Sequence, residues 1–204
     1  MKFRIIAVII VLAMILGSGA GVALFQDLGR IRWAEDAIEY LVEREVLSNS
    51  NIAFNPHGMV TRQEFTVLIV RAFELDMEVP PDEFGDITQN WSYGYVAAAV
   101  AAGIVTGFDD ENFGPMFNIR RQEMAVILYR AMRYSGIERE HLPIDREFVD
   151  SDLIGYWAVD AVNALASLGV IAGAPAADRF VLAPNANASR AEAAVMIYRV
   201  LRLM

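Results

Sequence analysis

The chain has 204 residues, of which 55% are hydrophobic, with no cysteine and a formal net charge of −9 at pH 7. Without cysteine it cannot form a disulfide, a cysteine-ligated zinc site, a thiol nucleophile or a lipidated cysteine anchor. Its acidic balance disfavours binding to nucleic acid or to an anionic membrane, because those partners need a basic face.

The first 23 residues have the pattern of a secretory signal peptide. Two basic residues precede an apolar run over residues 5–16, and small residues follow. This order is typical of signal peptides, and the apolar run is shorter than the ~20 residues that cross a membrane. We expect export, cleavage after Ala20 or Ala23, and contact with the membrane only through this segment. An uncleaved anchor is the alternative.

The rest of the chain contains three copies of one pattern, over residues 24–75, 84–134 and 148–204. Each copy opens with an aromatic-x-Asp triplet and then reaches a tryptophan. The residue 16 positions after each tryptophan is a Gly or Asn, the types that tolerate the left-handed conformation closing a helix. A proline and an Arg-x-Glu sequence follow at a fixed spacing. In chain order the repeated residues are Asp27, Trp33, Asn49, Arg62 and Glu64; Asp86, Trp91, Gly107, Arg121 and Glu123; and Asp150, Trp157, Gly173, Arg190 and Glu192.

Each copy is predicted to form two helices joined by an extended loop. The first helix follows the tryptophan, over residues 33–46, 91–102 and 157–168, where Ala, Leu and Val are frequent. The second follows each Arg-x-Glu sequence, where apolar residues recur at i, i+3, i+4 and i+7. A single helix pair cannot bury both apolar faces, so the copies should pack around one core. We therefore predict one all-α domain.

The start of the second helix is a candidate anion site. Thr61 with Glu64, and Ser189 with Glu192, fit capping boxes, in which the hydroxyl accepts from a backbone N–H and the glutamate accepts from the cap N–H. The arginine between them then occupies the first helical position, where free N–H groups and the positive helix end favour anions. A guanidinium there can bind a carboxylate with two hydrogen bonds.

Each of these residues also has a structural interpretation. The glutamates at positions 64, 123 and 192 can serve as caps alone. The arginines can form ion pairs with the aspartate of the aromatic-x-Asp triplet or with another acidic residue. The tryptophans can stack on sugar rings, but a tryptophan near a helix start is more often part of a core.

No part of the sequence suggests a metal ion or cofactor. His57 and His141 lie in separate turn-like segments without the spacing of metal ligands. The acidic stretch at residues 109–112 lacks the alternating ligands and distal glutamate of an EF-hand loop. We expect a solvated turn there.

The order Phe-x-Asp, Trp, Gly-Ile or Gly-Val, Phe-x-Pro and Thr-Arg-x-Glu resembles the S-layer homology (SLH) domain, which usually occurs in three tandem copies. The resemblance covers essentially everything after the signal peptide. It implies a pseudo-threefold helical bundle with ligand grooves between neighbouring repeats, in which the motif arginine contacts a sugar acid. The candidate carbohydrate-binding residues are then Arg62, Arg121, Arg190, Trp33, Trp91, Trp157, Asp27, Asp86, Asp150, Gly107 and Gly173, with Thr61, Glu64, Glu123, Ser189 and Glu192 as helix caps.

The copies differ in ways that predict unequal sites. Glu45 stands where the other copies have Gly103 and Gly169, so the first helix of copy one should end differently or its groove should be altered. Arg120 replaces the hydroxyl residue of the cap. The third copy has a longer loop, residues 173–184, where Leu-Ala-Pro replaces Phe-x-Pro.

The resemblance implies a non-enzymatic protein of the cell surface or cell wall that binds an anionic wall polysaccharide, such as a pyruvylated secondary polymer or a peptidoglycan-linked glycan. No obligate oligomer is implied. One alternative is a helical scaffold that binds a protein partner in the envelope. Another is a glycan-cleaving enzyme, although the sequence offers no distinctive pair of facing carboxylates. The sequence ends directly after the last predicted helix, which fits either an adapter or surface coat, or a truncated coding region.

Overall fold

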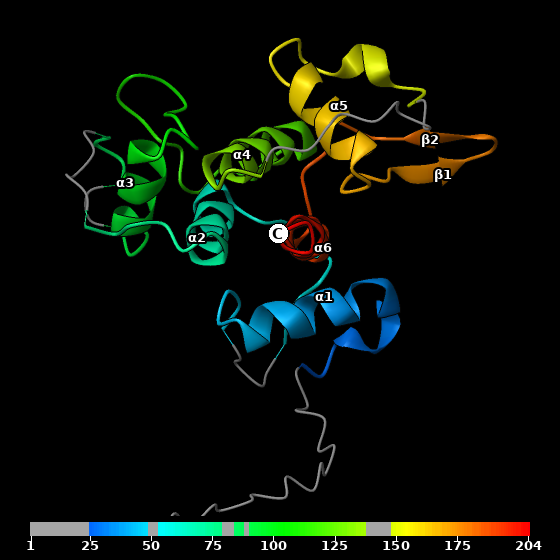
Figure 1. The fold of residues 1–204 in the computed structure, drawn as a ribbon, viewed down its shortest axis with the longest axis horizontal. Helices are drawn as coiled ribbons and strands as arrows, with labels where there is room; N and C mark the ends of the chain where they lie inside the picture. The colour runs from blue at the N-terminus through cyan, green and yellow to red at the C-terminus, as the bar shows by residue number, and fades with distance from the viewer. Residues whose placement is uncertain (1–24, 49–52, 79–83, 88–89, 138–147) are drawn as a thin grey trace, which may run out of the picture.

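The computed structural model describes residues 25–48, 53–78, 84–87, 90–137 and 148–204. The predicted signal peptide lies outside the described residues. The described part contains two helices per repeat, which confirms the prediction of a mostly helical domain (Figure 1). The helices are α1 (Arg32–Glu43), α2 (Arg62–Ala72), α3 (Tyr93–Ala101), α4 (Arg121–Tyr134), α5 (Val159–Ser167) and α6 (Arg190–Leu201), with short 3-10 helices η1 (Leu28–Arg30) and η2 (Ser151–Leu153).

The first helix of each repeat packs on the second helix of the preceding repeat, in cyclic order. Helix α3 packs on α2, α5 on α4, and α1 closes the ring by packing on α6. The second helices α2, α4 and α6 also contact one another, and Figure 1 shows α1, α3 and α5 outside them. Each packed pair therefore combines two repeats, and one repeat alone has no partner for its first helix.

Short backbone bridges also join the repeats near the start of the second helices. Three antiparallel bridges form, between Met59 and Ser189, between Thr61 and Asn118, and between Arg120 and Asn187. The three bridges follow the same cyclic order as the helices. They bring the amino-terminal ends of α2, α4 and α6 together at one end of the bundle.

The first helices of all three repeats end in the same conformation. Glu45, Gly103 and Gly169 have φ values of 59°, 69° and 72°. The expectation that the first helix of repeat one ends differently is therefore wrong. Glu45 adopts the left-handed conformation despite its Cβ, at a cost that glycine does not carry.

The residues 16 positions after each tryptophan do not close the helices, because the residues with positive φ that follow the helices lie four positions earlier. Asn49 lies outside the described residues. A Cβ on Gly107 would lie 2.4 Å from Phe84 Cε1, and a Cβ on Gly173 would lie 2.8 Å from Phe148 Cε1. Glycine at these positions lets the aromatic ring of the Phe-x-Asp triplet approach the backbone.

The longer loop of repeat three forms a hairpin that the sequence did not predict. Strands β1 (Ala174–Ala176) and β2 (Arg179–Val181) pair in antiparallel fashion. Phe180 of β2 also bridges to Phe148 of the third aromatic-x-Asp triplet. In the described part of the chain, no helix combines the length and hydrophobicity needed to cross a membrane.

Candidate functional site

The amino-terminal ends of the second helices are occupied by the next repeat. At α2 the backbone N–H groups of Arg62 and Gln63 donate to the carbonyl oxygens of Phe117 and Pro115, at 2.8 and 3.1 Å. Equivalent bonds join α4 to repeat three and α6 to repeat one. The first two N–H groups of each helix are thus already bonded. This corrects the view that a free helix end forms the anion site.

The predicted caps of α2 and α6 are confirmed. Thr61 and Ser189 each form a full capping box with the glutamate three residues later. At α4 the carboxylate of Glu123 accepts from the Arg120 N–H at 2.7 Å, but an arginine side chain has no acceptor for the reciprocal bond. In α2 and α6 the cap N–H bonds Oε2, and the other oxygen, Oε1, faces an arginine of the preceding repeat in the ring.

The repeated aspartates serve as latches within each repeat. The carboxylate of Asp27 accepts from the N–H groups of Phe54 and Asn55 at 2.8 and 2.7 Å. Asp86 and Asp150 make the same pair of bonds to the loop before α4 and α6. Burial alone would raise the pKa of the Asp27 carboxyl, but these N–H donors and the charge of Arg190 bring that pKa below its usual value. The carboxylate oxygens are therefore engaged by the fold.

The motif arginines each reach across to the next repeat. Arg62 Nε donates to Phe113 O at 3.1 Å and its guanidinium lies 4.9 Å from the centre of the Phe113 ring. Arg190 makes the equivalent contacts with Phe54, at 2.8 and 5.0 Å. Arg121 Nε donates to the carbonyl of Leu182 at 2.7 Å, where no ring is present. The arginines thus hold neighbouring repeats together, and Arg62 Nη2 also donates to the carbonyl oxygen of Thr106 at 2.7 Å. Each of the three guanidinium groups lines a cavity.

Three cavities of repeated composition lie beside these arginines, and we name each after its motif arginine. The Arg62 pocket has a volume of 380 Å³, the Arg190 pocket 320 Å³ and the Arg121 pocket 270 Å³. These volumes are at or near the lower end of the range for small-molecule sites, ~300–1,000 Å³. Every pocket takes residues from all three repeats.

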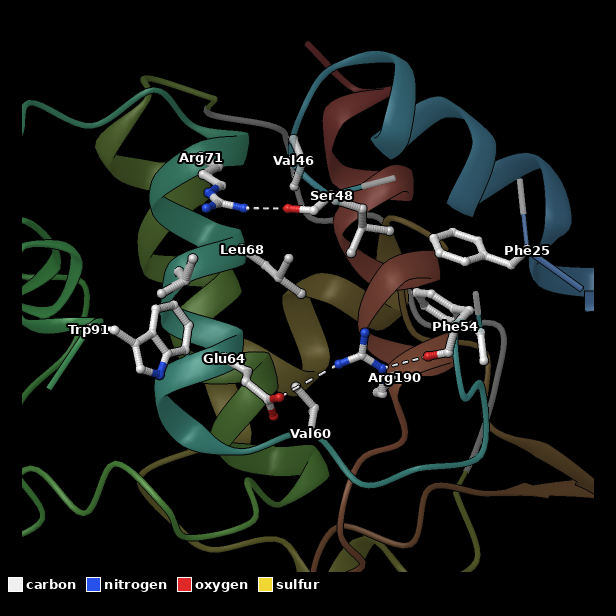
Figure 2. A pocket seen from close by; sticks show the side chains of 13 residues that line it. Phe25, Val46, Ser48, Phe54, Val60, Glu64, Leu68, Arg71, Trp91 and Arg190 are labelled. Carbon is white, nitrogen blue, oxygen red and sulfur yellow. Dashed lines mark hydrogen bonds and ion pairs between the residues drawn. The ribbon is translucent and has the colours of Figure 1, made fainter. Parts of the chain in front are cut away.

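One face of a second helix forms the floor of each pocket. In the Arg190 pocket this face presents Glu64, Val67, Leu68 and Arg71, spaced at i, i+3, i+4 and i+7 (Figure 2). Helices α4 and α6 present the same series to the other two pockets, namely Glu123, Val126, Ile127 and Arg130, and Glu192, Val195, Met196 and Arg199.

The tryptophans line the pockets and are not core residues. Trp91 lines the Arg190 pocket, Trp157 the Arg62 pocket and Trp33 the Arg121 pocket, with exposed fractions of 62%, 48% and 58%. The structural alternative, in which they pack inside the protein, is therefore wrong. Their exposed rings are available to a ligand.

Two buried glutamines position two of the tryptophan loops. Gln63 on α2 accepts a hydrogen bond from the Ser92 hydroxyl at 3.0 Å, next to Trp91. Gln122 on α4 accepts from the Gly155 N–H at 2.8 Å, two residues before Trp157. Each glutamine directly precedes the pocket glutamate. One turn of a second helix therefore positions both the glutamate and the tryptophan of a pocket.

The sequence reasoning missed a second arginine in each pocket. Arg71, Arg130 and Arg199 stand nine residues after the motif arginine in all three copies. Arg71 contacts Ser48 and Tyr95, and Arg199 donates to the carbonyl of Val170. The constant spacing was visible in the sequence and was the signal that could have identified them.

The charges of the pockets contrast with the acidic chain. Two arginines and one glutamate line each pocket, so each carries a net positive charge. The pKa of Arg62 lies below its ordinary value, mainly because burial desolvates the guanidinium. The negative charge of Glu123 raises this pKa, and the positive charge of Arg130 lowers it further. A carboxylate ligand would relieve this repulsion.

The acidic stretch at residues 109–112 forms a closed turn. The carboxylate of Asp109 accepts from the backbone N–H groups of Glu111 and Asn112 and from the Asn112 side chain, which lower its pKa. Among the described residues there is no group of three or more His, Cys, Asp or Glu that could hold a metal ion. His141 lies outside the described residues.

Comparison with known proteins identifies the family. The family model described as "S-layer homology domain" matches residues 24–66, 83–125 and 147–194. An amylopullulanase from Thermoanaerobacterium thermosulfurigenes is 36% identical over 179 residues, which are 87% of this chain and 9% of the relative. The S-layer protein of Bacillus licheniformis and S-layer protein EA1 of Bacillus anthracis are 31% and 30% identical over 200 residues, which are 95% of this chain and 22% of each relative. This chain thus spans less than a quarter of the length of these relatives. Because the three family matches cover more than half of the chain and fall on the three structural repeats, the chain belongs to the S-layer homology domain family.

Proposed function

We propose that this protein is exported and attaches non-covalently to the bacterial cell surface by binding an anionic secondary cell-wall polysaccharide, for example a pyruvylated one. The observation that carries the proposal is the repeated pocket, which combines two arginines, one glutamate and one exposed tryptophan. The predicted signal peptide and the S-layer relatives support the same location.

The chemistry of an acidic sugar fits these walls. A guanidinium can bind a carboxylate through two parallel hydrogen bonds, and two arginines can hold it from both sides. The face of an indole ring packs well against an apolar sugar face at low cost in side-chain entropy. Because the pocket charges are partly exposed, binding should weaken as the salt concentration rises.

The enzyme names among the relatives do not conflict with this proposal. An amylopullulanase and an exoglucanase match over 9% and 16% of their own length. We propose that the matching part supplies attachment and that catalysis belongs to the remainder of those proteins. An attachment module needs a binding pocket but no pair of catalytic carboxylates.

Co-sedimentation with purified cell walls tests the proposal. The purified protein should pellet with intact walls and stay in solution after chemical removal of the non-peptidoglycan polymer. Retention on stripped walls would instead indicate binding to peptidoglycan or to a protein partner.

A matched pair of triple variants assigns the binding to the pockets. Changing Arg71, Arg130 and Arg199 to Gln should weaken pelleting by about tenfold or more, because each pocket loses one cation. The control changes Arg44, Arg133 and Arg202 to Gln, which removes the same charge outside the three pockets and should leave pelleting within about twofold. Equal loss in both variants would mean that net charge alone drives adhesion.

A further inference from the structure

The three pockets have the same plan but different internal ion pairs. In the Arg121 pocket the guanidinium of Arg121 forms a close ion pair with the Glu192 carboxylate. In the Arg190 pocket the corresponding pair, Arg190 with Glu64, is looser, at 3.7 Å. In the Arg62 pocket, no carboxylate of a described residue lies within 4.0 Å of Arg62.

A sequence difference between the pockets explains why Arg121 pairs with Glu192. Arg62 and Arg190 rest on the rings of Phe113 and Phe54, whereas Arg121 meets Leu182 at the same position. A phenyl face attracts a guanidinium and holds it in place. Leucine offers no such attraction, and in this pocket the guanidinium pairs with Glu192.

The two pockets also differ in their aromatic surface. Gly107 and Gly173 are equivalent in the repeats, but the next residue is Phe108 in the Arg62 pocket and Ala174 in the Arg121 pocket. Phe108 is 66% exposed and is braced edge-on by Phe117, with 5.3 Å between ring centres. The Arg62 pocket therefore has two exposed aromatic rings, Trp157 and Phe108, whereas Trp33 is the one aromatic residue lining the Arg121 pocket in the part of the chain that the structure describes.

The second arginine of each pocket also distinguishes the Arg62 pocket from the other two. The side chain of Arg130 in the Arg62 pocket is exposed and makes no hydrogen bond or ion pair with a described residue, whereas the side chains of Arg71 and Arg199 are hydrogen-bonded. The Arg62 pocket is also the largest of the three and the Arg121 pocket the smallest. Ion pairing of the motif arginine, aromatic surface and volume thus agree in ranking these two pockets.

We propose that the Arg62 pocket is the primary site for an acidic oligosaccharide, and that Glu192 acts as a built-in carboxylate ligand that weakens the Arg121 pocket. This inference rests on the proposed function, because it assumes that the pockets bind acidic sugars. The two rings of the Arg62 pocket suit at least two linked sugar units, one beside the arginines and one on Phe108. In the Arg121 pocket an incoming carboxylate has to displace Glu192 before it can bind Arg121.

The positions of the tryptophans allow each pocket to be measured separately. The chain has three tryptophans, and each lines a different pocket. Three proteins that keep one tryptophan, with the other two changed to Phe, can be titrated with a methyl glycoside carrying a 4,6-linked pyruvyl ketal. The methyl ester of the same compound is the uncharged control. Half-saturation of the fluorescence change should come at the lowest concentration for Trp157 and at least about fivefold higher for Trp33.

A second change tests the role of the internal carboxylate. In the protein that keeps Trp33, Glu192→Gln should lower half-saturation by about fivefold, because the amide keeps an acceptor for the Ser189 cap but no longer competes as a charge. Asp178→Asn is the matched control, since it removes an exposed carboxylate of the same repeat that lines none of the three pockets.

The outcomes separate this ranking from the proposed function. Equal half-saturation for Trp157 and Trp33, or no effect of Glu192→Gln, would overturn the ranking while leaving sugar binding intact. If none of the three proteins responds and calorimetry detects no binding of the ketal, both the ranking and the proposed function are overturned.

Discussion

The aspartate latches and the tryptophan walls are both repeated three times, yet they have opposite roles. The carboxylates of Asp27, Asp86 and Asp150 are bonded to backbone N–H groups of the loops before the second helices. The tryptophans are about half exposed and line cavities. Internal repetition of a residue therefore does not tell whether that residue supports the fold or meets the ligand. Its hydrogen bonds and exposure do.

The largest effect should come from breaking a latch. Asp86→Ala leaves the N–H groups of Phe113 and Gly114 without their charged acceptor, and we expect a loss of about 3 kcal/mol in the free energy of unfolding. Urea denaturation measures this loss. Asp110→Ala removes an exposed carboxylate of the same repeat and should change stability by less than about 0.5 kcal/mol. An equally small change in stability for Asp86→Ala would show that Asp86 does not stabilise the fold.

Removing the tryptophan of a pocket should weaken ligand binding without destabilising the fold. Trp157→Ala should weaken binding of the ketal at the Arg62 pocket by about tenfold, while the free energy of unfolding changes by less than about 1 kcal/mol. Calorimetric titration and urea denaturation give the two numbers. Tyr156→Ala is the control, because Tyr156 is 92% exposed and lines none of the three pockets. A large loss of stability in the tryptophan variant would make Trp157 a packing residue.

Acid should weaken the latch formed by Asp27. The pKa of Asp27 is lower in the folded protein than its ordinary value, so its contribution to stability is fully present above that ordinary value and is lost as the pH falls through the folded pKa. We expect the stability difference between the native protein and Asp27→Asn to be constant from pH 7 to about pH 5 and to shrink below about pH 4. Unfolding measured across this range would contradict the assignment if the difference stayed constant.

The smallest effect concerns the end of α1. Glu45→Gly should raise stability by about 0.5 kcal/mol, because glycine adopts the left-handed conformation without strain but loses more entropy on folding. Gly103→Ala is the reciprocal change in repeat two, where a Cβ meets no atom within 4 Å, so its expected loss of about 1 kcal/mol reports backbone strain alone. Thermal unfolding can compare the two.

Local features of the fold could be predicted from the sequence. The capping boxes at Thr61 and Ser189, and Arg62 and Arg190 as the first residues of α2 and α6, were confirmed, because these signals depend on a few adjacent residues. The hairpin at residues 174–181 was missed because its strands have three residues each, too few for a periodic pattern.

Features that depend on packing between repeats could not be predicted. Periodicity shows that a helix has an apolar face but not which helix covers it, so the pairing of α1 with α6 was not visible. For the same reason the backbone carbonyls that occupy the amino-terminal ends of the second helices were missed. The exposure of the tryptophans also follows from this packing, since each one lies beside a helix of another repeat.

The pairing of α1 with α6 sets the order in which the protein can mature. Helix α1 cannot pack on α6 until α6 has left the ribosome, so the ring closes only after all three repeats have been synthesised.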